Sequence, residues 1–128
     1  MSVHLYQSDI REFQLAKAAI RAGIEILLQH AGLSALKLDK ILIGGAFSAG
    51  MSGEHLVRTG FLPKVDLCKI ELVGNVAGEG AKLALLDQDV MEEAERLAQR
   101  VEYLELSGNP RFSELYIEHI PLSAAPRS

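Results

Sequence analysis

The sequence predicts an α/β fold with a mixed sheet, in which at least two parallel strands are flanked by helices. Two short apolar runs, Lys40–Ile43 and Lys69–Val73, are typical of buried strands. The segments around them have helix caps and helical spacing, and they separate the two runs too widely for a hairpin. Strands joined through helices are parallel and connected by right-handed crossovers. The predicted order is therefore α-β-α-β-α-α-β-α, within one domain of 128 residues.

The first helix is predicted from Asp9 to about Ala31. Asp9 and Glu12 have the spacing of a capping box, and Gly32 is a typical residue just past a helix end. Apolar residues recur on one stripe of this helix, so we expect that stripe to face the core. Its members are Ile10, Phe13, Ile20, Ile24, Leu27 and Ala31.

The other elements follow from caps and chain breakers. The run Lys40–Ile43 shows no alternation of polar and apolar residues, so we expect this strand to be covered on both faces. The remaining predictions are a short helix that Ser52 caps and that stops at Gly60, a small-residue helix after Gly74, a helix from the capping box Asp89–Glu92 to about Arg100, a strand over Val101–Leu106, and a last helix from Pro110 to about His119.

Composition excludes several functional classes. A net charge of −4, with 5% aromatic residues and no tryptophan, argues against a nucleic-acid-binding protein. No apolar run approaches the length of a membrane span and the N-terminus lacks a signal-peptide pattern, so we expect a cytoplasmic protein without a membrane partner. Cys68 is the only cysteine and cannot hold an iron–sulfur cluster alone, and the histidines form no metal motif. The sequence therefore predicts no metal-ligating and no catalytic residue.

The glycine-rich segment after the first strand allows two interpretations. Gly45 and Gly50 have the spacing of a phosphate-binding P-loop with Ser52 in the hydroxyl position, but Met51 stands where that loop needs its lysine. What remains is the pair Gly44-Gly45 at the C-terminal end of a strand, the edge at which open α/β sheets bind ligands. Spacing alone slightly favours a tight turn with close helix packing over a ligand site.

A polar row on the first helix is the second candidate feature. Gln14, Lys17 and Arg21 are three and four residues apart and share one face of the helix. A lysine whose stem covers apolar surface while its amine reaches water is the common outcome. A polar row beside a glycine loop could instead face a ligand, although the residues alone favour the first interpretation.

Taken in order, the segments resemble the C-terminal lobe of the acetate and sugar kinase, heat-shock chaperone and actin (ASKHA) superfamily of ATPases. The shared pattern is a long helix, a strand ending in Gly-Gly, a helix, a strand and a small-residue helix. More narrowly, DIREFQLAKAAIRAGIEILL, LIGGAFSAGMSGEHLVRTGFLP, VGNVAGEGAKLALL and AERLAQRVEYLEL are together similar to the C-terminal domain of reductive activators of corrinoid proteins. The resemblance covers roughly residues 7–119 and implies a ribonuclease-H-like, actin-like ATPase lobe.

The resemblance also implies a larger protein and its partners. Such activators have a ferredoxin-like N-terminal domain with a 2Fe–2S cluster, a linker region and a two-lobed ATPase. They use ATP and magnesium to return cobalt(II) to cobalt(I) in a corrinoid protein of a methyltransferase system. This chain lacks the cluster cysteines and the first lobe. We therefore expect the cofactors only in the full-length protein, an inactive isolated fragment, and as partners the corrinoid protein, the remaining domains and optionally a second copy.

Within the chain, the resemblance implies half of an ATP site. The double-glycine turn would pass beneath the adenosine, and the polar row of the first helix would lie on its rim. The implied contact residues are Gly44, Gly45, Ala46, Phe47 and Ser48, with Gln14, Lys17 and Arg21 at the rim. Gly44 and Ser48 stand where related sequences more often have alanine and glycine.

Residues 1–6 are expected to be an N-terminal extension, 7–122 the single lobe, and 123–128 a frayed tail. The alternative function is a non-catalytic domain of the same fold that dimerises or docks a corrinoid protein. The small-residue helix after Gly74 supports that alternative, because small residues allow close helix packing.

Overall fold

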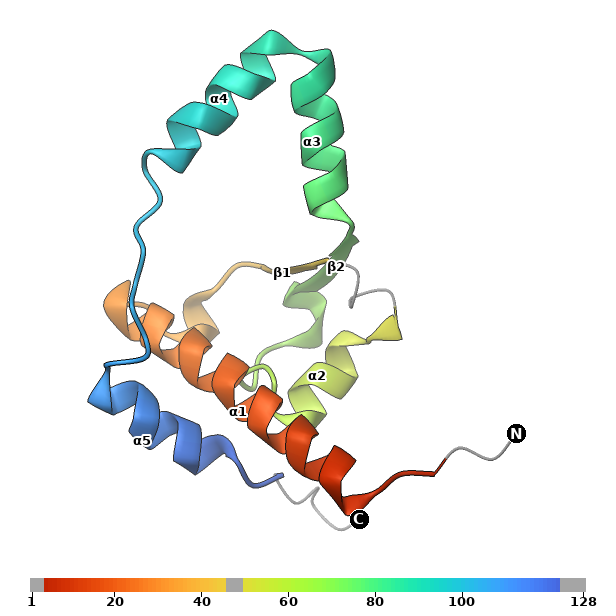
Figure 1. Cartoon of the computed structure of the whole chain (residues 1–128), viewed down its shortest axis with the longest axis vertical. Helices are drawn as coiled ribbons and strands as arrows, with labels where there is room; N and C mark the ends of the chain where they lie inside the picture. Colours follow the sequence, from red (N-terminus) through yellow and green to blue (C-terminus); the bar gives the residue numbers. More distant parts are fainter. Residues whose placement is uncertain (1–3, 46–49, 123–128) are drawn as a thin grey trace.

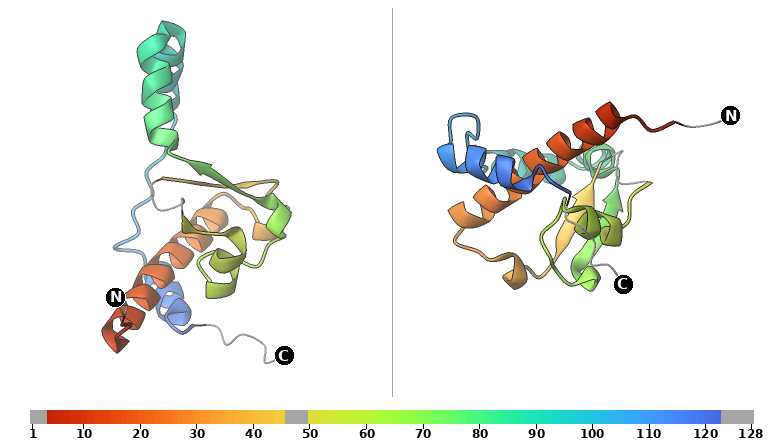
Figure 2. Two further views of the ribbon diagram at one scale, coloured as in Figure 1. Left: turned by 90° about the vertical axis from the view of Figure 1, so that its right-hand side faces the viewer. Right: turned by 90° about the horizontal axis from the view of Figure 1, so that it is seen from below.

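The computed structural model describes residues 4–45 and 50–122, and their arrangement confirms the predicted α/β class (Figure 1). A long helix lies between a second helix on one side and a small sheet with a short helix on the other (Figure 2). The elements are α1 (Gln7–His30), η1 (Ala35–Lys37), β1 (Ile41–Gly44), α2 (Gly53–Thr59), η3 (Leu67–Lys69), β2 (Ile70–Gly74), α3 (Val76–Leu86), α4 (Gln88–Ala98) and α5 (Pro110–His119).

The two described strands pair in parallel, as expected. Ile41 pairs with Ile70 and Ile43 with Leu72, and the register shifts before Gly44. α2 lies against this sheet, since a Cβ added at Gly53 would come within 3.0 Å of Ile70 Cγ2.

The expectation that the first strand is covered on both faces is wrong. Leu42 is 61% exposed, and its partner Glu71 forms a surface ion pair with Lys40 at 3.1 Å. α2, which connects the two strands, packs on the sheet. α3, which follows β2, leads away from the sheet and does not cover it (Figure 1).

The core forms where α1 packs on α5. Ala22 is fully buried, and Ile26 and Leu115 are almost fully buried beside it. Leu104 and Leu106 from the preceding connection pack against the same cluster. Small residues on α1 let α5 approach closely, so burial of apolar surface stabilises the contact between the two helices.

The face of α1 that was predicted to be buried is the wrong one. Phe13, Ile20 and Leu27 are 41%, 50% and 55% exposed. The buried positions are Lys17, Ala18, Ala22, Gly23 and Ile26. The helix is apolar around most of its circumference, so periodicity did not identify the side that α5 covers.

Two helix starts differ from the predictions by a few residues. α1 begins at Gln7, after the N-cap residue Tyr6. Asp9 lies in the first turn and accepts a hydrogen bond from the Tyr6 N–H at 2.8 Å, so it is the acidic residue of the capping box and not the N-cap. α4 is capped by Asp87, which accepts from the Asp89 N–H at 2.9 Å. The predicted caps Ser52 and Asn109 are confirmed.

The strand predicted over Val101–Leu106 does not form. This segment is extended but has no strand partner among the described residues. It runs alongside the body from α4 to α5 (Figure 1). Its alternation reflects packing on one side only, because Leu104 and Leu106 contact the α1–α5 core while Tyr103 is 80% exposed.

α3 and α4 form an arm that stands away from the rest of the molecule (Figure 2). The two helices pack on each other, and no residue of either is buried. Large apolar side chains on the arm are exposed, from 44% at Met91 to 87% at Leu85. The arm therefore contributes apolar surface without a described partner.

Candidate functional site

The two strands end in glycines at the same edge of the sheet. The Gly45 N–H donates a hydrogen bond to the Gly74 carbonyl at 2.7 Å, which closes the edge. Gly45 and Gly74 have φ values of +103° and +66°, in the left-handed region that favours glycine. Both turns therefore depend on glycine for their backbone conformation.

Gly44 has a different requirement from its neighbour. A Cβ at Gly44 would lie 2.6 Å from Val76 Cγ2 at the start of α3, which is too close for a real contact. A Cβ at Gly45 would meet nothing within 4 Å. Gly44 is thus a glycine because Val76 packs too close to leave room for a side chain. Gly45 has a left-handed backbone conformation and open space beside its Cα.

The start of α3 borders this edge. Asn75 caps the helix by accepting from the Gly78 N–H at 3.2 Å. A side chain at Gly78 would overlap the Asn75 amide, with a Cβ to Nδ2 distance of 2.5 Å. The cap therefore explains the glycine at 78. Of the other predicted loop residues, Ala46, Phe47 and Ser48 lie outside the described residues.

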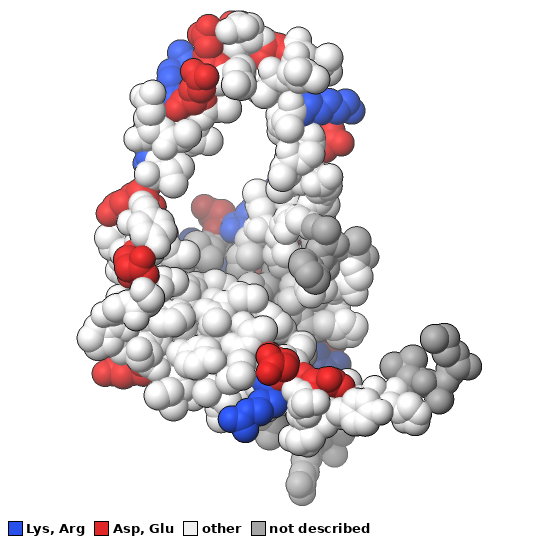
Figure 3. All heavy atoms as spheres, in the orientation of Figure 1, with Lys and Arg blue, Asp and Glu red and all other residues white. Residues whose placement is uncertain are grey.

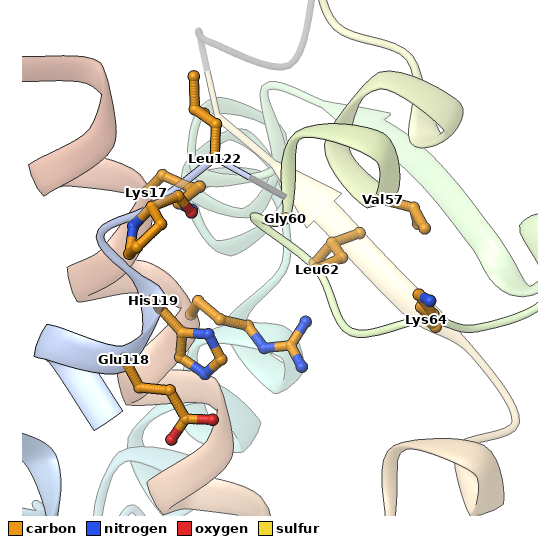
Figure 4. Close-up of a pocket in the computed structure, with 10 residues that line it drawn as sticks. Lys17, Val57, Gly60, Leu62, Lys64, Glu118, His119 and Leu122 are labelled. Carbon is orange, nitrogen blue, oxygen red and sulfur yellow. The ribbon is translucent and has the colours of Figure 1, made fainter. Parts of the chain in front are cut away.

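The polar row of α1 leads to a separate cavity of about 500 Å³ (Figure 4). Lys17 and Arg21 line it, together with the end of α2 and the residues that follow α5. Gln14 is half-buried and does not line this cavity, and neither do Gly44 and Gly45. The structure thus joins two of the predicted rim residues to each other but not to the double glycine.

Lys17 is buried, with 3% of its surface exposed. Its Nζ donates a hydrogen bond to the Pro121 carbonyl at 2.7 Å, just past the end of α5. It also lies beside Gly60, whose added Cβ would be 3.8 Å from Nζ. Burial, and then the nearby Arg21 charge, lower the pKa of Lys17 from its ordinary value.

Arg21 and His119 meet at one carboxylate. Arg21 donates through Nε to Glu25 Oε1 at 2.8 Å, and His119 Nε2 lies 3.1 Å from the same oxygen. Sequence analysis missed His119, Glu118 and Lys64 as lining residues of this cavity. No local signal could have found His119, because it is brought to Glu25 only by the packing of α5 on α1.

Two absences hold for residues 4–45 and 50–122. No group of three or more His, Cys, Asp or Glu side chains there is arranged to hold a metal ion. No helix in these ranges is long and apolar enough to cross a membrane.

The known proteins with which this chain shares sequence and fold have the names of corrinoid activators. Residues 1–126 match the family described as the C-terminal, ASKHA domain of RACo. The chain is 34% identical over 111 residues to the corrinoid activation enzyme RamQ of Eubacterium limosum, covering 87% of this chain. It also matches the solved structure of a reductive activator for corrinoid, iron-sulfur protein with a TM-score of 0.86 and 30% identity over 92% of the chain. The chain spans only 19% of the length of each relative.

The packing role of Gly44 is tested by Gly44→Ala. We expect it to lower the free energy of unfolding by about 1–3 kcal/mol, because the new methyl group overlaps Val76. Combined with Val76→Ala, which removes the overlapping methyl groups, the same change should cost little. Urea denaturation followed by circular dichroism measures both. Gly50→Ala, where a Cβ meets nothing within 4 Å, is the matched control, and equal costs at Gly44 in both backgrounds would contradict the assignment.

The buried Lys17 predicts a pH dependence of stability. The folded chain holds the Lys17 proton less tightly than the unfolded chain, in which the amine titrates near 10.5. Just below that pH the unfolded state binds more protons, so the free energy of unfolding should rise as pH rises toward 10.5. Lys17→Met should reduce this slope in urea titrations at several alkaline pH values. Lys82→Met, at an exposed lysine of α3, is the control, and an unchanged slope in Lys17→Met would refute the prediction.

Proposed function

The chain belongs to the family of the C-terminal ASKHA domain of RACo, and we propose that it is the C-terminal nucleotide-binding lobe of an ATP-dependent activator that restores cobalt(I) in corrinoid proteins. The names of the two relatives, a corrinoid activation enzyme and a reductive activator, support the activity. The protein that contains this lobe would act in a methyltransferase system, in the cytoplasm. Its direct partners would be a corrinoid protein and the other domains of its own polypeptide.

The observation that carries the nucleotide assignment is the glycine edge of the sheet. Gly45 turns with a positive φ and has open space where a side chain would be. A ligand can therefore approach the backbone at the C-terminal end of the strands, the edge at which α/β sheets bind ligands. We assign the adenosine side of the site to Gly44 and Gly45, with Ala46, Phe47 and Ser48 following them.

The role of the α1 residues is narrower in this proposal. Gln14, Lys17 and Arg21 were predicted as the rim of the nucleotide site. Lys17 and Arg21 already bind Pro121 and Glu25. In the proposal they support the lobe from the side of α5, and they meet the nucleotide only if the other lobe of the ATPase brings it to their cavity.

In this proposal, the groups that bind phosphate and metal belong to the other lobe of the full-length protein. The described residues contain no group suited to a metal ion, and Met51 stands in place of the P-loop lysine. When bound, ATP and magnesium supply the free energy and the charge neutralisation of phosphoryl transfer. The 2Fe–2S cluster belongs to an N-terminal domain in this proposal, because the sequence has only Cys68.

A rival proposal has one observation in its favour. The α3–α4 arm exposes apolar side chains, as a domain that dimerises or docks a corrinoid protein would. Nucleotide titration of the two-lobed protein separates the two proposals, since absence of binding would favour the rival.

Gly45→Val in the full-length protein should abolish ATP-dependent reactivation and nucleotide binding, and the strain at φ +103° should lower stability locally without unfolding the rest of the lobe. The added side chain would fill the space through which the nucleotide approaches. Isothermal titration with ATP and a reactivation assay measure the loss, and circular dichroism checks the fold. Gly45→Ala, a smaller change, should weaken binding less.

Gly32→Val is the matched control for that experiment. Gly32 also has a positive φ, of +65°, and open space around its Cα, but it ends α1 away from the sheet edge. Gly45 at φ +103° is the more strained position of the two, so the free energy of unfolding of each variant is measured beside its ATP binding. Equal loss of ATP binding in the two variants, or unchanged binding in Gly45→Val, would contradict the assignment of the adenosine side to Gly45.

The isolated chain should hydrolyse ATP no faster than the uncatalysed reaction. Stabilising the transferring phosphoryl group needs a metal ion, and the described residues contain no group arranged to hold one. Phosphate release by the purified 128-residue chain measures this. Sustained turnover would show that the chain is more than half of a site.

A further inference from the structure

The cavity beside Lys17 is lined by more positive than negative charge. Lys17, Arg21 and Lys64 are cationic and only Glu118 is anionic, so the lining has a net charge of +2 before His119 is counted. The whole chain, in contrast, has a net charge of −4. On the face shown in Figure 3, acidic and basic side chains lie next to one another, and acidic ones gather near the tip of the arm. The excess of positive charge is therefore a property of the cavity and not of the composition.

Lys17 is the most buried of these cations and has no opposite charge beside it. It is 3% exposed and forms no ion pair within residues 4–45 and 50–122. The Pro121 carbonyl at 2.7 Å is neutral and accepts from one of the three N–H groups of the amine. The neighbouring charge that acts on this amine, Arg21, has the same sign. An anion in the cavity would supply both the opposite charge and the acceptors that the buried amine lacks.

Arg21, His119 and Lys64 also have donors to spare. Glu25 Oε1 lies 2.8 Å from Arg21 Nε and 2.7 Å from Nη2, and it lies 3.1 Å from His119 Nε2. This carboxylate offsets one positive charge, but Arg21 Nη1 and the second His119 nitrogen have no hydrogen bond to a described residue. Lys64 is exposed and has no hydrogen bond or ion pair within the described part of the chain. Donors from three separate segments therefore remain available in one cavity.

The size and the remaining lining of the cavity suit a small molecule. Its volume of about 500 Å³ lies in the range of small-molecule sites. Apolar side chains, among them Val57 and Leu62, form the wall opposite Lys17 and His119 (Figure 4). A ligand for this cavity would thus combine an anionic group with a small apolar body.

From these observations we infer that the cavity binds a small organic anion, a carboxylate or a phosphate monoester, at a site separate from the glycine edge. Lys17 and Arg21 hold the anionic group from α1, His119 donates from α5, and Lys64 donates from the opposite wall. Carboxylate and phosphate oxygens share the required chemistry, since both are charged and accept several hydrogen bonds. The bound anion would join α1 to the ends of α2 and α5. No residue of the glycine edge lines this cavity, so the inference does not depend on the nucleotide assignment.

Isothermal titration of the full-length protein with glycerol 3-phosphate and with succinate tests the inference. At least one of these two anions should bind at a single site, and the one that binds more tightly identifies the anionic group. Glycerol and succinamide are the matched neutral probes and should not bind, because they have similar shapes without the charge.

Two variants change the charge of the lining in opposite directions. Lys64→Gln should raise the dissociation constant of the anion about two- to fivefold, and Glu118→Gln should lower it by a similar factor. Both side chains are exposed, so neither change should disturb folding, and tighter binding in Glu118→Gln cannot result from a damaged fold. Arg21→Gln should raise the dissociation constant about tenfold or more, because it removes a charged donor that is mostly buried. Circular dichroism checks the fold of this third variant.

Lys37→Gln is the control, since it removes an exposed lysine outside the cavity and should leave the affinity for the anion unchanged. Absence of binding by both anions would overturn the inference, as would unchanged affinity in Lys64→Gln and Arg21→Gln or an equal loss in Lys37→Gln. Displacement of the anion by saturating ATP would show that the cavity is part of the nucleotide site, and would also overturn it. ATP titration of Lys64→Gln should give the wild-type affinity. Because the probes contain no adenosine, a failure to bind them leaves the proposed function untouched.

Discussion

The packing of α1 on α5 is the contact on which the rest of the structure depends. It joins the first helix to the last, and the apolar cluster around Ala22 and Leu115 supplies the burial that holds them together. Once the two helices are in contact, Lys17 reaches the Pro121 carbonyl and Glu25 reaches His119. These polar bonds add little net stability compared with burial, but they fix how the helices are aligned. The connection before α5 packs on the same core through Leu104 and Leu106. α3 and α4 therefore lie between two anchored segments, the sheet before them and this connection after them.

The double glycine after β1 combines two separate physical requirements. Gly44 is small because Val76 occupies the place of its side chain, whereas Gly45 turns with a positive φ beside open space. Packing and ligand approach were alternatives when only the spacing was considered. Packing applies to Gly44, and ligand approach at Gly45 stays a proposal. A nucleotide is the ligand that we propose for that edge, and the chain spans only 19% of the length of the relatives that it matches.

Local signals predicted most of the elements because a helix cap acts within one turn. Ser52, Gly60, Asn109 and Gly32 mark helix ends as expected. Asp9 and Asp89 were assigned as caps although the neighbouring positions begin the helices, because an acid in the first turn has the same sequence signature as an acid at the cap. The glycine edge was also identified from sequence. The cavity beside Lys17 was not, since Arg21, Lys64 and His119 come from segments far apart in the chain.

By itself, the sequence determined the class of fold, the order of the helices and of the two paired strands, the parallel pairing and the resemblance to corrinoid activators. These depend on short-range patterns and on the order of segments along the chain. Only the tertiary structure decided which side of α1 is buried, because Phe13 and Ile20 are as apolar as the residues that α5 covers. It also decided that Val101–Leu106 stays unpaired and that α3 leads away from the sheet. An extended, alternating segment becomes a strand only where the N–H and C=O groups of another strand are available for hydrogen bonding. Whether such a strand lies beside it depends on the tertiary structure.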